Sequence, residues 1–107
     1  MTLGYTPMRG ASEAPEDVLR ARDLQVTGPA LLQLAAHRDP LVRAVVAARP
    51  DCPPGALISL GHDHHLPVLE ALISNPKTPS SVIRNLGDNR NPRIADLAVQ
   101  RLRNSFR

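Results

Sequence analysis

The sequence predicts an all-α protein, a helical solenoid of about three two-helix repeats of 26 residues that follow a half repeat. Apolar residues recur at intervals of 26 positions, and prolines recur at the boundaries between the recurring stretches. Hydrophobic residues make up 42% of the chain but aromatic residues only 2%. A core of Leu, Val, Ile and Ala needs many small, regular contacts, and stacked helices provide them.

The length of 107 residues suits one small domain. We expect residues 1–11 to form a disordered N-terminus and residues 12–107 to form a single helical-repeat domain. The predicted half repeat spans residues 12–27, and the full repeats, named units 1, 2 and 3, span residues 28–52, 53–78 and 79–104.

Six columns of apolar residues, each with a spacing of 26, set the register of the three units. The anchor column is Leu34, Leu60 and Leu86. The other five columns are Ala30, Ala56, Val82; Leu31, Leu57, Ile83; Val42, Val68, Ile94; Val45, Ala71, Leu97; and Val46, Leu72, Ala98.

The first predicted element is a helix near residues 14–24, in the half repeat that caps the amino end. Pro15 suits a first helical position, and Glu16 and Asp17 suit the positive end of a helix dipole. Each unit then begins with a short helix, such as Pro29–Ala36, whose apolar residues share one face. Turns follow at residues 37–39, 62–65 and 88–91.

The second helix of each unit is predicted to be longer, at about ten residues. Asp39-Pro40 and Asn91-Pro92 place an N-cap side chain directly before a proline at the first helical position. Unit 2 lacks this start, so its boundary is less sharply defined by the sequence.

These helices are predicted to end where Pro50 and Pro76 disfavour helical geometry in the preceding residue. Leu102 stands at the equivalent position of unit 3. The last helix is therefore expected to continue through Arg101 and Arg103, whose charges complement the carboxyl end of its dipole.

The residues from Ala71 to Pro79 (ALISNPKTP), together with Val42-Arg43 and Val46-Ala47 of unit 1, follow a pattern near L-x-x-L-A-x-D-x-x-x-x-V-R-x-x-V-A-x-N-P-x-T-P. In this the chain resembles the variant leucine-rich repeat family of bacteria over residues 29–104. The resemblance implies alternating short and long helices, the short ones often of the tighter type, stacked into a right-handed superhelix. HEAT-like helix pairs are the alternative fold, because units of 26 residues are slightly longer than is usual for the family.

Some members of that family carry a cysteine-rich iron–sulfur segment, which this chain lacks, and we expect no cofactor. Cys52 is the only cysteine, which favours a reducing compartment. The N-terminal residues contain no long apolar run. We therefore expect a cytoplasmic protein without a membrane anchor.

His62, Asp63, His64 and His65 form the only cluster with metal-ligand chemistry. Four consecutive residues of a turn cannot all converge on one ion, so a polar turn is the favoured interpretation and a metal site the alternative. No sequence context marks a nucleophile or a general base, and we do not expect an enzyme. Arg43 is not repeated in units 2 and 3, and we expect it to form a salt bridge to a neighbouring unit.

The net charge of +3 is unevenly distributed, because residues 79–107 hold six arginines against two aspartates. One column, Arg38, His64 and Arg90, places a basic residue directly before each second helix. We expect this basic column to lie beside helix amino termini, which favour anions. A solvated rim is the alternative interpretation.

A second candidate surface is a ridge of the longer helices, formed by columns 41/67/93, 44/70/96 and 48/74/100. Its apolar start suits a peptide or helix partner. The candidate partner-binding residues of both surfaces, with the arginines of unit 3, are Arg38, His64, Arg90, Arg93, Arg84, Leu41 and Pro67.

The sequence thus predicts a protein-interaction module, a scaffold or adaptor, whose most probable partner is a protein. Nucleic-acid binding through the Arg-rich edge is the alternative, although the chain offers almost no aromatic side chains on which bases stack. Three units are close to the minimum for an independent solenoid. We therefore also expect a homodimer through the solenoid ends.

Overall fold

The computed structural model describes residues 9–105, with side chains from Glu16 onward. This part of the chain is all-helical, without a strand, as the sequence predicts. Its helices are α1 (Arg9–Arg22), α2 (Gly28–Ala35), α3 (Pro40–Ala47), α4 (Pro54–Leu60), α5 (Leu66–Ser74), α6 (Ser80–Leu86) and α7 (Pro92–Ser105).

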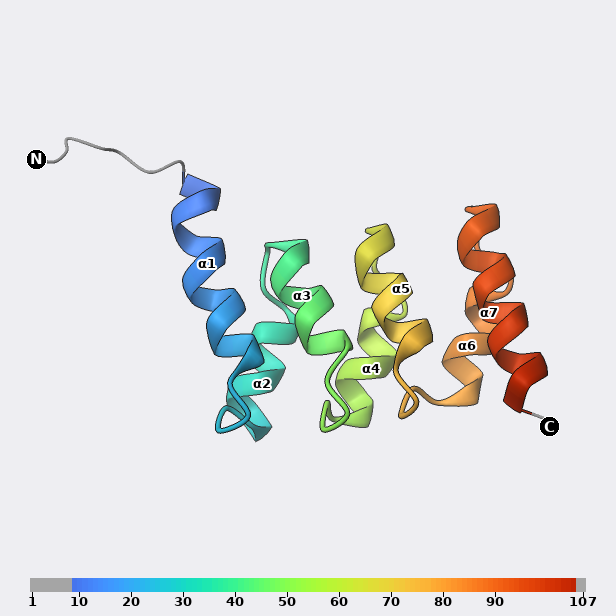
Figure 1. The fold of residues 1–107 in the computed structure, drawn as a ribbon, viewed down its shortest axis with the longest axis horizontal. Coiled ribbons are helices and arrows are strands. Elements are labelled where there is room, and N and C mark those ends of the chain that lie inside the picture. The colour runs from blue at the N-terminus through green and yellow to red at the C-terminus, as the bar shows by residue number, and fades with distance from the viewer. Residues whose placement is uncertain (1–8, 106–107) are drawn as a thin grey trace, which may run out of the picture.

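The odd-numbered helices lie side by side in one row, and α2, α4 and α6 form a second row (Figure 1). Each odd helix packs against the next: α1 against α3, α3 against α5, and α5 against α7. The molecule is elongated along this row, with principal extents of 58 × 29 × 19 Å. Each unit therefore packs against the next unit along the long axis of the molecule.

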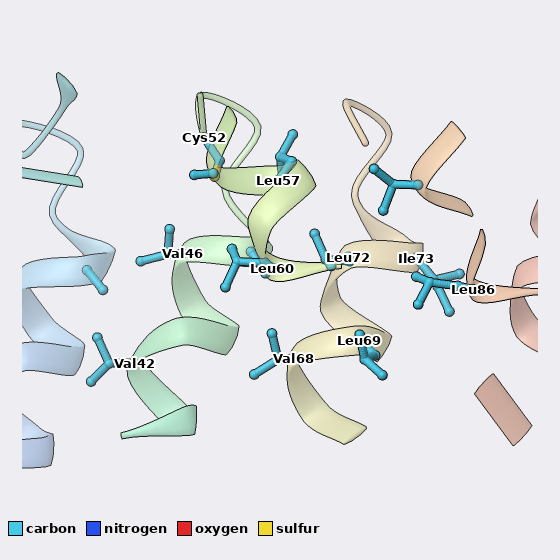
Figure 2. Close-up of a cluster of buried hydrophobic side chains, with 14 of the residues drawn as sticks. Val42, Val46, Cys52, Leu57, Leu60, Val68, Leu69, Leu72, Ile73 and Leu86 are labelled. Atoms are coloured by element: carbon cyan, nitrogen blue, oxygen red, sulfur yellow. The ribbon is translucent and has the colours of Figure 1, made fainter. Parts of the chain in front are cut away.

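The predicted register is confirmed by burial. All members of the anchor column are 3% exposed, and the columns of Leu31, Val42 and Val46 are at most 1% exposed. The column of Val45 is half-buried and packs against the core. Figure 2 shows the continuity of this core, with α3, α4 and α5 contributing to one cluster.

Helix α1 begins and ends earlier than the helix predicted near residues 14–24. Of the segment expected to be disordered, residues 1–11, the structure describes residues 9–11, which belong to α1. Residues 1–8 lie outside the described residues.

The predicted N-caps are confirmed. Asp39 Oδ1 accepts from the backbone N–H of Leu41, and Asn91 Oδ1 accepts from that of Arg93, both over 2.9 Å. In unit 2, α5 begins after His65 without a side-chain cap. Its second residue is Pro67, whose missing N–H lies where a helix leaves its donors unpaired.

One expectation about helix type is wrong. The even helices are α-helical over seven or eight residues, not of the tighter type that the resemblance implies. Their apolar residues recur at α-helical spacing, which places them on one face of the helix. The second helix is longer than the first in units 2 and 3, as predicted, but α3 has eight residues, no more than α2.

At the carboxyl end, α7 runs over 14 residues and includes Arg101 and Arg103, as predicted. No helix in the described part of the chain has the length and apolar composition needed to cross a membrane.

Candidate functional site

One polar column, buried at its first two members and half-buried at its third, joins consecutive odd helices. Its members are Arg49, Asn75 and Arg101, and each donates to the backbone carbonyls 28 and 26 positions earlier. The acceptors are the carbonyl oxygens of Ala21 and Asp23, of Ala47 and Arg49, and of Ile73 and Asn75. The carbonyls lie where the preceding odd helix ends and leaves its acceptors unpaired. We name this set the carbonyl column.

The buried Arg49 guanidinium is also neutralised within its own turn. Its Nε and Nη2 donate to the Asp51 carboxylate over 2.8 and 2.6 Å. The hydrogen bond from Arg49 holds the pKa of Asp51 below its usual range. Asn75, which carries no charge, needs no such partner, and its Oδ1 accepts instead from the backbone N–H of Lys77.

A second column orders the turns between the two rows of helices. His37 Nδ1, Asp63 Oδ1 and Asn89 Oδ1 each accept over 2.9 Å from the backbone N–H two residues later. These three residues are 26 positions apart, so the same turn is built three times with three different acceptors. They place the turns of the three units along one edge of the molecule, which we name the turn edge.

At two positions along the turn edge, a side-chain contact spans 20 residues. His37 Nε2 donates to Asp17 Oδ2 over 2.7 Å. One unit further on, Arg43 Nε forms a salt bridge with Asp63 Oδ2 over 2.6 Å. The two contacts occupy equivalent positions with donor and acceptor exchanged. Arg43 therefore bridges to the neighbouring unit, as expected.

The Arg43–Asp63 pair is well sheltered, with side chains only 14% and 8% exposed. Burial alone would raise the pKa of Asp63, but hydrogen bonds from Arg43 and from His65 outweigh it and leave the pKa below its ordinary value. Arg43 Nη1 also donates to the carbonyl oxygen of His37 over 2.7 Å. The pair therefore connects helix α3 to the turns of units 1 and 2.

The third equivalent position has no ion pair, because its residues are Leu69 and Asn89. Between units 1 and 2, a groove between α2 and α4 is lined by Arg43 and Asp63 and has a volume of about 260 Å³. Between units 2 and 3, a groove on the turn edge has a volume of about 600 Å³, and Leu69 and Asn89 are among its lining residues.

The larger groove, which we name the turn groove, combines polar and apolar groups. Leu69 is buried beneath it at 2% exposure. Its charged and polar side chains come from two turns that lie far apart in the sequence. The lining residues are Gly61, His62, Asp63, His64, Leu66, Leu69, Asn89, Arg90 and Asn91.

The turn groove continues onto the row of even helices. A second groove of about 330 Å³, which we name the helix groove, lies between α4 and α6 and is also lined by Gly61, His62 and Asn89. A Cβ on Gly61 would stand 3.0 Å from Cγ1 of Val82. Glycine at this position therefore permits the close approach of units 2 and 3 at the junction of the two grooves.

The structure brings together two members of the predicted basic column. His64 and Arg90 are exposed and line the turn groove, whereas Arg38 is exposed between α2 and α3 and does not line it. All three lie directly before the second helix of their unit, as predicted, but only two of them line this groove. Each groove lies between only two units, so a column of three residues cannot enter one groove.

The remaining predicted site residues lie elsewhere. Leu41 and Pro67 are exposed on the ridge of the odd helices, as predicted. Arg93, on the same ridge, donates to Glu70 over 2.8 Å. Arg84 is exposed on α6 and lines neither groove.

The described residues contain no group of three or more His, Cys, Asp and Glu side chains arranged to hold a metal ion. Asp63, the carboxylate of the histidine cluster, is engaged by Arg43. Burial raises the pKa of the Cys52 thiol to about 11. That thiol is therefore protonated at neutral pH and poorly suited to act as a nucleophile.

Comparison of the chain with protein-family models, with curated proteins and with solved structures gives no match.

Proposed function

We propose that this chain is a protein-interaction module, a scaffold or adaptor of the helical-solenoid class, that binds a segment of a partner protein in the turn groove. The observation that carries the proposal is the groove of about 600 Å³ on the turn edge between units 2 and 3. Leu69 and Asn89 stand at the positions that Arg43 and Asp63 hold one unit earlier, form no ion pair and line this groove.

The solenoid class is supported by contacts that recur with the sequence interval. The carbonyl column uses the same two acceptor positions at three successive boundaries. Units that contact only their neighbours expose a continuous surface, and such proteins are used mainly to bind partners. The groove chemistry fits this use, because a buried leucine lies among exposed polar groups that can orient a ligand.

Nucleic-acid binding is disfavoured by the engagement of the arginines of unit 3. Arg93 is paired with Glu70, and Arg101 donates to carbonyl oxygens of unit 2. No Phe, Tyr or Trp side chain lines either groove, so neither offers the large aromatic platform on which bases commonly stack. A peptide segment fits the site better than a phosphate backbone.

The test introduces at the turn groove the salt bridge that Arg43 and Asp63 form between units 1 and 2. Leu69→Arg with Asn89→Asp places at this boundary the two residues that pair between units 1 and 2. Peptides selected from a random display library on the wild-type protein are measured on both proteins by fluorescence anisotropy. We expect binding to weaken by at least about tenfold in this double variant, which we name the closed variant. The variant should remain folded with a lower melting temperature, because a charged pair replaces the buried Leu69. Equal binding by a folded closed variant would overturn the proposal.

A control variant sharpens this test. Glu70→Arg with Asp96→Arg changes the ridge of the odd helices instead. If the ridge variant abolishes binding and the closed variant does not, the partner docks on the odd helices and the turn groove is not the site.

A further inference from the structure

We infer that the ligand of the turn groove is an extended peptide with an acidic side chain at one end and a basic side chain at the other. This inference rests on the proposed function, because it names the chemistry of the segment that occupies the same site.

The first argument is continuity. The turn groove and the helix groove share Gly61, His62 and Asn89. Together they follow the boundary between units 2 and 3 from the turn edge to the surface between α4 and α6. A ligand that fills both must therefore be elongated and must cross the junction at Gly61, where the absence of a side chain keeps the path narrow but open.

The second argument is the hydrogen-bonding character of the lining. Amide side chains recur along the path, with Asn91 and Asn89 in the turn groove and Asn89 and Asn85 in the helix groove. Amides both donate and accept hydrogen bonds. An extended backbone has N–H and C=O groups that need such partners, whereas a helix satisfies its own. The lining therefore favours an extended peptide over a docked helix.

The third argument is charge. The turn groove presents the exposed basic side chains of His64 and Arg90. Its only carboxylate, Asp63, is held by Arg43 at 2.6 Å and is offset by that charge. An acidic side chain of the ligand is therefore favoured at this end.

The helix groove differs from the turn groove in the charge of its lining. The charged groups that line it are the exposed Asp88 and the histidine His62, which it shares with the turn groove. Its other polar groups are hydroxyl and amide side chains. A basic side chain of the ligand is favoured here. The two ends thus set both the composition and the direction of the bound peptide.

The test exchanges charges on both partners. Peptides are selected by display on the wild-type protein, and we expect acidic and basic positions in a fixed order. Reversing the acidic position of a selected peptide to Lys should weaken binding by about tenfold, since hydrogen bonds to charged groups are among the stronger ones. Arg90→Glu should restore the reversed peptide, and Asp88→Lys should do the same for a peptide reversed at its basic position.

Arg103→Glu is the matched control, because Arg103 is exposed on α7 and lines neither groove. Arg103→Glu changes the net charge by the same amount as Arg90→Glu and should leave the preferred charge order of the bound peptide unchanged. The inference is wrong, while the proposed function stands, if peptides bind the groove without a fixed order of charges. The same holds if Arg90→Glu and Asp88→Lys weaken the binding of all peptides and do not restore the binding of the reversed ones. If no peptide is enriched, or if the enriched peptides do not distinguish the closed variant, both are wrong.

Discussion

The side-chain amide of Asn75 donates to the carbonyl oxygen of Arg49 over 2.8 Å, across 26 residues of sequence. The guanidinium of Arg49 repeats this contact one unit earlier, with the carbonyl oxygen of Asp23 at 2.9 Å. An amide and a guanidinium thus perform one structural task at equivalent positions. Both are buried, with Asn75 2% and Arg49 5% exposed. The ends of the odd helices are therefore satisfied by the next unit rather than by solvent.

This relationship predicts a large effect of a single substitution. Asn75→Leu keeps a buried side chain of similar size but leaves the carbonyls of Ala47 and Arg49 without this donor. Each unsatisfied buried acceptor destabilises by about 1–3 kcal/mol, so we expect the free energy of unfolding to fall by about 2–4 kcal/mol in urea titrations. A fall of less than about 0.5 kcal/mol would show that the column contributes little.

The control for this variant rebuilds the arrangement of unit 1. Asn75→Arg with Lys77→Asp supplies the donor and the carboxylate that Arg49 and Asp51 provide there. We expect this double variant to retain most of the stability that Asn75→Leu loses. Asn75→Arg alone, beside Lys77, should retain less, because a buried charge without a partner is unfavourable.

The buried register makes a second prediction. Leu60→Asp should lower the free energy of unfolding by several kcal/mol, because Leu60 is 3% exposed and an unpaired charge would enter the core. Ile58→Asp, on the same helix, should change it by only about 0.5 kcal/mol, since Ile58 is 50% exposed. Similar melting temperatures for the two variants would contradict the register.

A third prediction concerns the contribution of the Arg43–Asp63 pair to the stability of the fold at acidic pH. The pKa of Asp63 in the folded chain is lower than its ordinary value of 3.8. The pair therefore stabilises the fold fully above that pH and less as the pH falls through the folded pKa. We expect the stability measured by urea unfolding to decline as the pH falls below about 4. Asp63→Asn should decline less steeply, although Asp51 still contributes through its own lowered pKa. Identical slopes for the two proteins would remove Asp63 as a cause.

The carboxyl end makes a fourth prediction. Val99 lies 26 residues after Ile73, in the column that each following odd helix covers. Ile73 is 6% exposed, whereas Val99 is 40% exposed because no further unit follows in the described chain. Ile73→Asp should therefore be severe and Val99→Asp mild in thermal unfolding.

The same substitution tests the homodimer expected from the sequence. If a second copy covers this end, the wild-type protein should sediment as a dimer at tens of micromolar and Val99→Asp as a monomer. A monomeric wild-type protein with a sharp, concentration-independent thermal transition would argue against a homodimer through this end.

The features that the sequence determined by itself are those with local physical causes. Apolar spacing places Leu34, Leu60 and Leu86 on buried faces, since helical periodicity acts within a few residues. The Asp39 and Asn91 caps likewise act on N–H groups only two residues away. The extension of α7 follows from a leucine in place of a proline. For these reasons the all-α class, the register and most helix boundaries are readable from the chain.

The candidate site was only partly readable, because its contacts span 20 to 28 residues. Opposite charges 20 positions apart, as in Arg43 and Asp63, were a signal in the sequence, but only the packing of the units shows which such pairs meet. The carbonyl column could not be recognised from residue types, because Arg49 and Asn75 differ in size and charge. They share only a side-chain N–H that donates to a carbonyl oxygen. Whether a boundary is closed or open depends on side chains from two units, and the tertiary structure alone decided that the groove lies between units 2 and 3.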